Sequence, residues 1–404
     1  MNISVIRKLF SHFLTGSGQR NRVWLCMIWA GAIAALLPIF LGLRAPEPSA
    51  FRTHIAIDAS YIGALIICGI LVKTELPQMG IKRAVALVFL IFLLSSTTNQ
   101  IHNFNVDRAS NYAPPFSNET LQEHLQEAVI RLSPSAVPHS YRFLPNALVY
   151  CLQLSGVRFD AARDIYRLIT GLLLFYALYR FARLYTNLHG ALFALLLISL
   201  IYPISFELYI GQLTDPLSQL SFVLAFIFIE TDNFALLLTT LLLGSLAKET
   251  VLALFGFYVL FGRRSHNYVW KAALLCFVSV GTFLAVRLFV LHGSIHYNQI
   301  SNPGSNHVWE NWRDTKWQRL FLLTGGAYLP FVALGWNQTP VALKRLVCYL
   351  LPVIFLSSLF FSWLSETRNW MPVVFVLAVI TACYWRNANN VLSGKSAPGF
   401  AGPG

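Results

Sequence analysis

Long apolar runs separated by short polar turns fill the chain from Val23 onward. Many of them approach the ~20 residues that a helix needs to cross a bilayer. Basic residues gather in alternate turns, which the positive-inside rule assigns to the cytoplasm. The pattern therefore predicts an all-α integral membrane protein with about 12 transmembrane helices and both termini cytoplasmic. The expected spans cover about residues 23–43, 55–72, 84–97, 163–184, 188–208, 216–230, 235–246, 251–261, 269–291, 319–336, 346–363 and 369–385.

Three segments follow from this pattern. Residues 1–83 hold a basic interfacial helix and two spans that precede the core, and residues 84–385 form the membrane core. Residues 386–404 are rich in Gly, Pro and Ser, which predicts a disordered cytoplasmic tail. Within the core we expect two polar external loops, at 98–141 and 292–318.

The apolar run from Phe143 to Leu154 is too short to cross a bilayer. Pro145 near its start suits the first turn of a helix. If this run crossed, Arg180 and Arg183 at the end of the next span would face outward, against the positive-inside rule. We therefore expect a juxtamembrane helix in the outer interface.

The composition also indicates a membrane protein, and it disfavours nucleic-acid binding, a disulfide framework and a zinc site. Hydrophobic residues make up 56% of the chain and charged residues only 12%, and the mean hydropathy is +0.58. The net charge of +13 sits largely in turns between spans, where it indicates topology rather than nucleic-acid binding. All six cysteines lie in apolar runs at irregular spacing, which favours neither a disulfide framework nor a zinc site.

An ionisable pair interrupts the apolar sequence in the stretch Gly244–Thr250, GSLAKET. Burying one charge at mid-depth costs about 2.5 to 3.5 kcal/mol on insertion scales. Lys248 and Glu249 are therefore expected at a water-filled cavity or at a turn near one face. They either form a salt bridge that closes a hairpin, or Glu249 orients Lys248 toward an anionic ligand.

Other ionisable residues are predicted on the same, external face. Asp215 either caps the sixth span or belongs to a site. Arg287 lies near the external end of its span, where it either snorkels to headgroups or contacts a ligand. Glu366 and Arg368 can pair locally, and Arg142 precedes the juxtamembrane helix, where headgroup contact is the common role.

Two further groups occur in the external loops. Asp107 follows the third span, and such a carboxylate is either a general base or an ordinary solvated acid. The spacing of His292, His296 and His307 matches no metal template, so no metal site is assigned and a divalent ion stays an open alternative.

Together these positions place acids and basic residues on one membrane face. Basic groups at headgroup depth suit a phosphate carried by a lipid, and an acid above them suits deprotonation of a nucleophile. A transporter is expected to hold its ionisable groups near the midplane, often within inverted repeats, and no repeat of fixed period is visible. The set therefore favours group transfer from a polyprenyl-linked donor over transport.

Several stretches resemble the polytopic GT-C superfamily of glycosyltransferases, enzymes of the mannosyltransferase type that take sugars from polyprenyl phosphates. The similar pieces are an external acid followed by an aromatic residue (Asp107, Tyr112), RFLPNALVYCLQLSGV, LYRFARLY, YIGQLTDPLSQL, LAKET, AVRLFV and the E-x-R of Glu366 and Arg368. The resemblance covers residues 84–385. It departs from the family pattern because Asp107 is followed by Arg108 rather than by a second acid, no large C-terminal soluble domain is present, and two extra spans precede the core.

The resemblance implies roles for individual residues. Asp107 is the expected catalytic base. The expected contacts to the lipid phosphate are Lys248, Arg287, Arg368 and Arg142, supported by the acids Asp215, Glu249 and Glu366.

The predicted function is transfer of a sugar, with inversion, from a polyprenyl-phosphate donor to a glycan, lipid or protein acceptor on the external face of a bacterial inner membrane. Two alternatives stay open: a polymerase or ligase of surface polysaccharide, and a non-catalytic flippase or transporter of lipid-linked glycans. The expected partners are the lipid-linked donor and membrane lipids, without nucleic acid.

Overall fold

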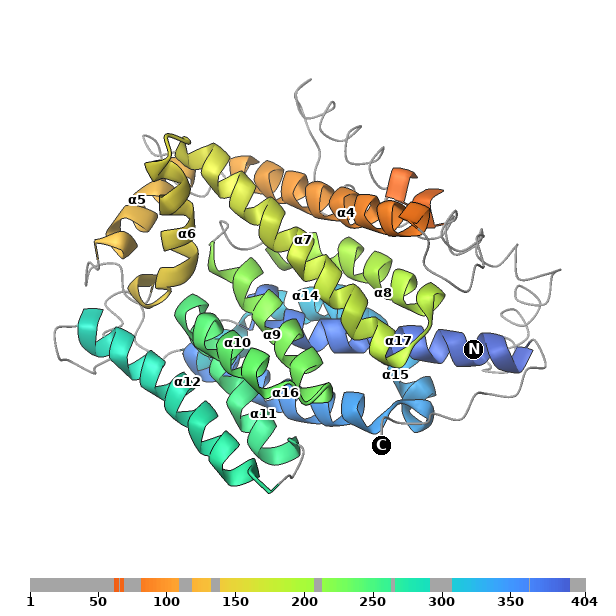
Figure 1. The fold of residues 1–404 in the computed structure, drawn as a ribbon. Helices are drawn as coiled ribbons and strands as arrows, with labels where there is room; N and C mark the ends of the chain where they lie inside the picture. The colour runs from red at the N-terminus through yellow and green to blue at the C-terminus, as the bar shows by residue number, and fades with distance from the viewer. Residues whose placement is uncertain are drawn as a thin grey trace.

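The computed structural model describes residues 62–64, 66–68, 81–108, 118–131, 139–206, 213–262, 266–290, 307–362 and 364–392. Every element within these ranges is a helix, so the described part of the chain has the expected all-α fold. The longer helices lie alongside one another, and α5 and α6 cover one end of the bundle (Figure 1). The N-terminal interfacial helix and the first expected span lie outside the described residues.

Within the described residues, five helices are long and apolar enough to cross a membrane. They are residues 84–101 of α4 (Ile81–Arg108), α7 (Phe159–Tyr185), residues 268–288 of α12 (Tyr268–Val290), residues 341–360 of α16 (Val341–Phe361), and residues 367–388, which include most of α17 (Met371–Leu392). The other expected spans that are described form shorter helices. The chain is thus compatible with a multi-pass membrane protein, and the number of about 12 spans stays a prediction.

The shorter elements complete the bundle. They are α5 (Asn118–Ile130), η2 (His139–Tyr141), α6 (Phe143–Leu154), α8 (Leu188–Ile201), η3 (Tyr202–Phe206), α9 (Thr214–Glu230), α10 (Phe234–Ala247), η4 (Glu249–Leu252), α11 (Ala253–Phe261), α13 (His307–Arg313) and η7 (Thr367–Trp370). Helix α6 has the bounds expected for the juxtamembrane helix, with Pro145 in its first turn. It packs against α5 and α7.

Some expected boundaries are wrong. Helix α4 runs to Arg108 rather than ending near residue 97, and the expected loop 98–141 also holds α5 and η2. Helix α17 extends to Leu392, so residues 386–392 are helical rather than part of the tail.

The tenth expected span is broken into four short helices. They are α14 (Lys316–Thr324), η5 (Gly326–Tyr328), α15 (Leu329–Gly335) and η6 (Trp336–Gln338). Gly325 and Gly326 follow directly after α14, the first of these helices, and glycine is a poor helix former. Pro330 lies in the first turn of α15, where it lacks the N–H that a continuous helix needs.

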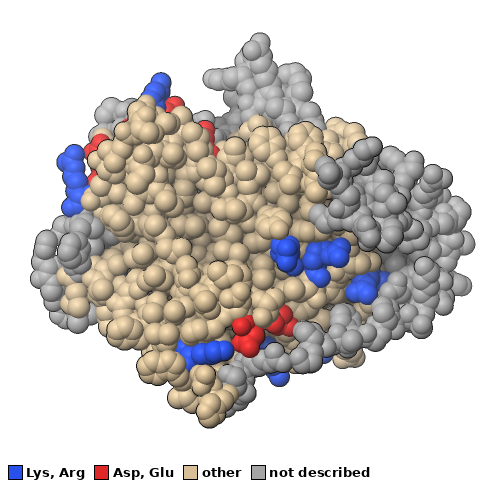
Figure 2. Space-filling model, viewed as in Figure 1, with Lys and Arg blue, Asp and Glu red and all other residues tan. Residues whose placement is uncertain are grey.

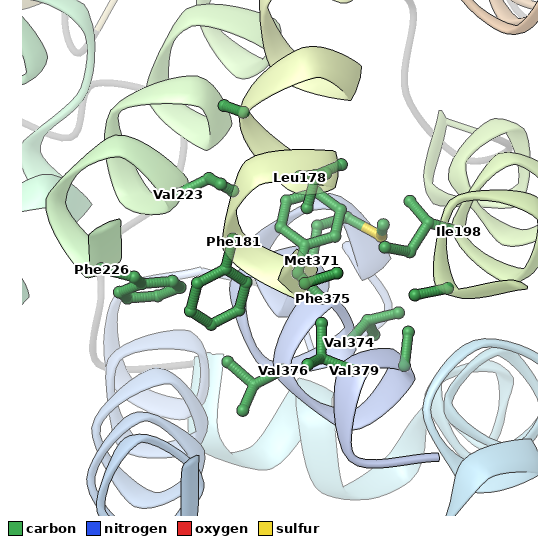
Figure 3. Close-up of a cluster of buried hydrophobic side chains, with 14 of the residues drawn as sticks. Leu178, Phe181, Ile198, Val223, Phe226, Met371, Val374, Phe375, Val376 and Val379 are labelled. Carbon is green, nitrogen blue, oxygen red and sulfur yellow. The ribbon is translucent and has the colours of Figure 1, made fainter. Parts of the chain in front are cut away.

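Helix α17 lies at the centre of the apolar core. Its side chains from Met371 to Cys383 are nearly all fully buried, and it packs against α8, α15 and α16. Figure 3 shows Phe375 of α17 among side chains of α7, α8 and α9, where the rings of Phe181 and Phe226 lie 5.5 Å apart. On the face shown in Figure 2 a broad area carries no charged side chain, as expected for a surface in contact with lipid.

Two glycines bring helices into close contact. A Cβ on Gly171 of α7 would lie 2.4 Å from the Ser95 hydroxyl of α4. A Cβ on Gly244 of α10 would lie 2.9 Å from Cβ of Ser221 on α9 and 2.7 Å from Val251 of η4. Small residues allow such approach between membrane helices, and the second contact sets the position of the turn that follows α10.

Candidate functional site

The turn between α10 and η4 points its two ionisable side chains toward different partners. Helix α10 ends at Ala247, and Lys248 has an extended backbone with φ −162° and ψ 137°. The Lys248 ammonium donates to Oδ1 of Asp215 at 2.8 Å and to Oδ1 of Asn369 at 2.8 Å. Glu249 instead pairs with Arg142. Of the two interpretations of this pair, the salt bridge between the adjacent Lys248 and Glu249 is therefore wrong, because the helix break separates their side chains.

Asp215 is held by two cations. Its second oxygen, Oδ2, accepts a hydrogen bond from the Arg368 guanidinium at 2.9 Å. The residue is 1% exposed. Leu213, not Asp215, is the N-cap of α9, and no side-chain capping bond forms there. Capping therefore does not explain Asp215, which instead joins the end of α10 to η7.

Glu366 binds the second terminal nitrogen of the Arg368 guanidinium, Nη2, whereas Asp215 binds Nη1. Its Oε2 accepts hydrogen bonds from Arg368 at 3.0 Å, from the Ser362 hydroxyl at 2.9 Å and from the Asn369 amide at 3.0 Å. The expected local pair of Glu366 and Arg368 is confirmed, and Arg368 also reaches Asp215 across the bundle. Burial raises the pKa of Glu366, but Arg368 and Lys248 more than offset this and lower it overall, so the carboxylate stays ionised.

Arg142 links the juxtamembrane helix to the same turn. It is the N-cap residue of α6. Its guanidinium donates to Glu249 through Nη2 at 2.7 Å and through Nε at 3.2 Å. This two-point geometry is the strong form of an arginine–carboxylate pair. Arg142 is buried, so an exposed headgroup contact does not describe its place.

Arg287 lies beside this pair. Its guanidinium carbon is 4.3 Å from the ring centre of Tyr141 and 3.5 Å from that of Phe283. Arg287 is 6% exposed, which excludes snorkelling into solvent within the described structure. Because Tyr141 directly precedes Arg142, Arg287 belongs to the same region.

Seven ionisable side chains thus gather at the ends of several helices, and we call them the charge network. They are Arg142, Asp215, Lys248, Glu249, Arg287, Glu366 and Arg368. Four are basic and three are acidic, so the network has a formal charge of +1. Of the three N–H donors of Lys248, the described residues accept two. The arrangement can accept one anionic group.

Several neighbours of the network were not identified from sequence. Asn369 bridges Lys248 and Glu366. The Gln219 amide donates to the Arg368 carbonyl at 3.3 Å. Burial, followed by the charges of Arg142 and Arg368, lowers the pKa of His139 to about 3. The sequence signal that could identify these neighbours is adjacency, because Asn369 directly follows Arg368 and His139 closely precedes Arg142.

The side chains of the remaining predicted site residues lie outside the part of the chain that the structure describes. Asp107 lies in the last turn of α4, and its side chain is outside the described residues. His292 and His296 also lie outside, while His307 begins α13. Among the described residues no group of three metal-ligating side chains occurs.

Comparisons with family models, with curated proteins and with solved structures gave no match to this chain. The resemblance to GT-C glycosyltransferases therefore rests on the residues themselves, and the geometry of the charge network is the basis for assigning a function.

Proposed function

We propose that the charge network binds the phosphate of a polyprenyl-linked sugar and that the protein transfers this sugar to an acceptor at the external membrane face. The observation that carries the proposal is the gathering of four buried basic side chains beside three acids, with one N–H of Lys248 that no described residue accepts. Basic side chains bind a phosphate through charge-assisted hydrogen bonds, so a site of this kind favours an anionic ligand.

The location of the network supports a lipid-borne phosphate. Its residues come from the start of α6 and α9, the ends of α10 and α12, and the segment that begins α17. Apolar helices precede and follow Lys248 in the sequence. A phosphate at this depth can keep its polyprenyl chain in contact with lipid while its oxygens meet the basic groups.

In the proposed reaction a base removes the proton from an acceptor hydroxyl. The hydroxyl oxygen then bonds to the anomeric carbon of the sugar, and the bond from that carbon to the phosphate oxygen breaks. The polyprenyl phosphate leaves with the electron pair, stabilised by Lys248 and Arg368, and the anomeric centre is inverted. Asp107 is the base that the sequence offers.

The proposed orientation places the network outside the cytoplasm. The opposite end of α7 carries Arg180 and Arg183, and α16 begins with Lys344 and Arg345 in its first turns, so the positive-inside rule assigns those ends to the cytoplasm. Reporter fusions at Lys344 should signal the cytoplasm, and fusions at Arg131 should signal the outside. The reverse result would place the network on the wrong face for this donor.

Binding of polyprenyl phosphate to the purified protein in neutral-lipid nanodiscs tests the function directly. The lipid should raise the thermal midpoint, and Lys248→Met should weaken its apparent affinity about tenfold to a hundredfold, the loss expected for a hydrogen bond to a charged group. Lys271→Met is the matched control, because Lys271 lies 3.8 Å from Asp232, outside the network. No midpoint shift in the wild type, or an equal loss in both variants, would refute the proposal.

A further inference from the structure

The short helix α13 turns two tryptophan side chains away from the rest of the protein. Trp309 is 65% exposed and Trp312 is 75% exposed. They are three residues apart, so they are neighbours on the helix surface. The guanidinium carbon of Arg313 lies 5.9 Å from the ring centre of Trp309. Large aromatic side chains that are exposed together mark a contact with a membrane or a partner.

Another side of α13 is fixed to the end of α16 by Asn311, which is 1% exposed. Its amide donates to three carbonyls of this end, those of Ser358 at 3.3 Å, Leu359 at 3.2 Å and Ser362 at 2.9 Å. Its Oδ1 accepts from the N–H of Leu364 at 2.7 Å. The last carbonyls of a helix have no partner within that helix, so these bonds satisfy the end of α16. Helix α13 therefore has a defined place at this end.

The end of α16 marks a boundary of the membrane. Residues 341–360 of α16 are long and apolar enough to cross a bilayer. Helix α13 packs against the end of this span, so it lies where hydrocarbon gives way to lipid headgroups. Tryptophan is enriched at this level because its ring is apolar and its N–H is polar. The neighbouring Arg313 adds a cation that can meet lipid phosphates, so these side chains suit the headgroup region better than bulk water.

Helix α13 is joined to the charge network through Ser362. The carbonyl of Ser362 accepts from Asn311, and its hydroxyl donates to Oε2 of Glu366 at 2.9 Å. The Asn369 amide donates to the same hydroxyl at 3.3 Å. Glu366 in turn accepts from Arg368. A continuous chain of hydrogen bonds therefore connects α13 with the segment that carries Glu366 and Arg368.

We infer that α13 is a membrane anchor: the indoles of Trp309 and Trp312 insert among phospholipid headgroups on the side of the charge network, and Asn311 passes this position on to the network. The partner is the bilayer surface itself, and the cation of Arg313 complements the phosphates of its headgroups. The inference does not need the proposed sugar transfer, because it concerns how the network is held at the membrane surface. It places this part of the expected loop 292–318 on the membrane rather than in solution.

Depth-resolved fluorescence quenching tests the contact with lipid. The full chain is placed in phosphatidylcholine nanodiscs whose lipids carry bromine either near the headgroup or near the end of the acyl chain. The fluorescence lost in Trp309→Phe or Trp312→Phe, relative to the wild type, reports on the indole that was removed. Both contributions should be quenched more by the shallow bromine than by the deep one. Trp370→Phe is the buried control, because Trp370 is 5% exposed, and neither lipid should quench its contribution.

Three results of this measurement would overturn the inference. Quenching of both indoles by iodide in the buffer, and by neither brominated lipid, would place α13 in solution. Stronger quenching by the deep bromine would place the indoles in hydrocarbon rather than among headgroups. Protection from iodide and from both lipids would show that another protein surface, such as a second copy of the chain, covers them.

Hydrogen exchange in the same nanodiscs tests the link to the network. The double variant Trp309→Ser with Trp312→Ser should speed exchange in α13 and in η7, because α13 loses its hold on the membrane. Trp270→Ser is the matched control: Trp270 is 71% exposed and lies in the first turn of α12, far along that helix from Arg287, so exchange in η7 should stay unchanged. Unchanged exchange in η7 of the double variant would refute the link. Neither measurement uses polyprenyl phosphate, so failure of the proposed function would leave both expectations standing.

Discussion

The ion pair between Lys248 and Asp215 gives the most direct test of the charge network. Lys248→Met removes the ammonium that donates to Oδ1 of Asp215, while Arg368 still donates to Oδ2. Breaking a buried pair typically costs about 3 to 5 kcal/mol because a charge is left uncompensated. Since Arg368 still neutralises Asp215, we expect the lower end, a decrease of about 3 kcal/mol in the free energy of unfolding.

A double-mutant cycle isolates the pair. Asp215→Asn leaves two cations facing a neutral amide and should destabilise by a similar amount. The double variant should lose less free energy of unfolding than the sum of the two single losses, and the difference is a coupling free energy of about 1 to 3 kcal/mol between the two positions. Lys248→Arg keeps the charge and serves as the conservative control.

The assay is equilibrium unfolding in mixed micelles, followed by circular dichroism, for the wild type, the two single variants and the double variant. Additive losses, with a coupling free energy below about 0.5 kcal/mol, would show that the pair of Lys248 and Asp215 does not hold α9 against the end of α10. A loss in the double variant that exceeds the sum of the two single losses would refute the reasoning in the same way.

Three further predictions follow from neighbouring contacts. Gly244→Ala should lower the free energy of unfolding by about 1 to 3 kcal/mol and weaken polyprenyl-phosphate binding, because the new Cβ meets Ser221. Gly281→Ala is the control in the same unfolding and binding assays: a Cβ there meets nothing within 4 Å, so it should not lower the free energy of unfolding and should leave binding unchanged. Glu249→Gln should speed hydrogen exchange in α6 without changing exchange in α17, because it removes the carboxylate bound by Arg142, and unchanged exchange in α6 would contradict this role. The lowered pKa of His139, about 3 against 6.5 when unfolded, stabilises the fold fully above pH 6.5 and progressively less as pH falls toward 3. His139→Gln should therefore remove a stability loss of about 2 kcal/mol between pH 6.5 and 5, measured by unfolding at each pH, and an unchanged pH profile would contradict the shift.

Hydrophobic patterning predicted much of the helical framework because lipid-facing and buried helices must both be apolar. The juxtamembrane helix from Phe143 to Leu154 has the bounds expected from its length and flanking residues. Boundaries failed where polar residues extend a helix, as in α4, which continues through Ser95 and Thr98. The hydroxyls of these residues bond to carbonyls of the helix bundle, so they do not interrupt it.

Sequence indicated which residues belong to the candidate site, but not how they pair. Lys248 and Asp215 are 33 residues apart, and their contact depends on α10 packing against α9 through Gly244. Adjacent residues such as Lys248 and Glu249 look like partners in a linear sequence. The break in the helix at Lys248 sends their side chains to different elements, and no periodicity in the apolar runs signals that break.

The pairing also limits which acids can take part in proton transfer. Asp215 accepts from two cations, Glu249 from Arg142, and Glu366 from Arg368 and Asn369. A carboxylate bound in this way favours its ionised form and is a weak base, so these acids hold the cations in position rather than remove a proton. If the protein is a transferase, its base lies elsewhere. Helix α4 packs against η3, and η3 packs against η7, where Arg368 lies. Asp107, in the last turn of α4, stays the residue that we expect to act as this base.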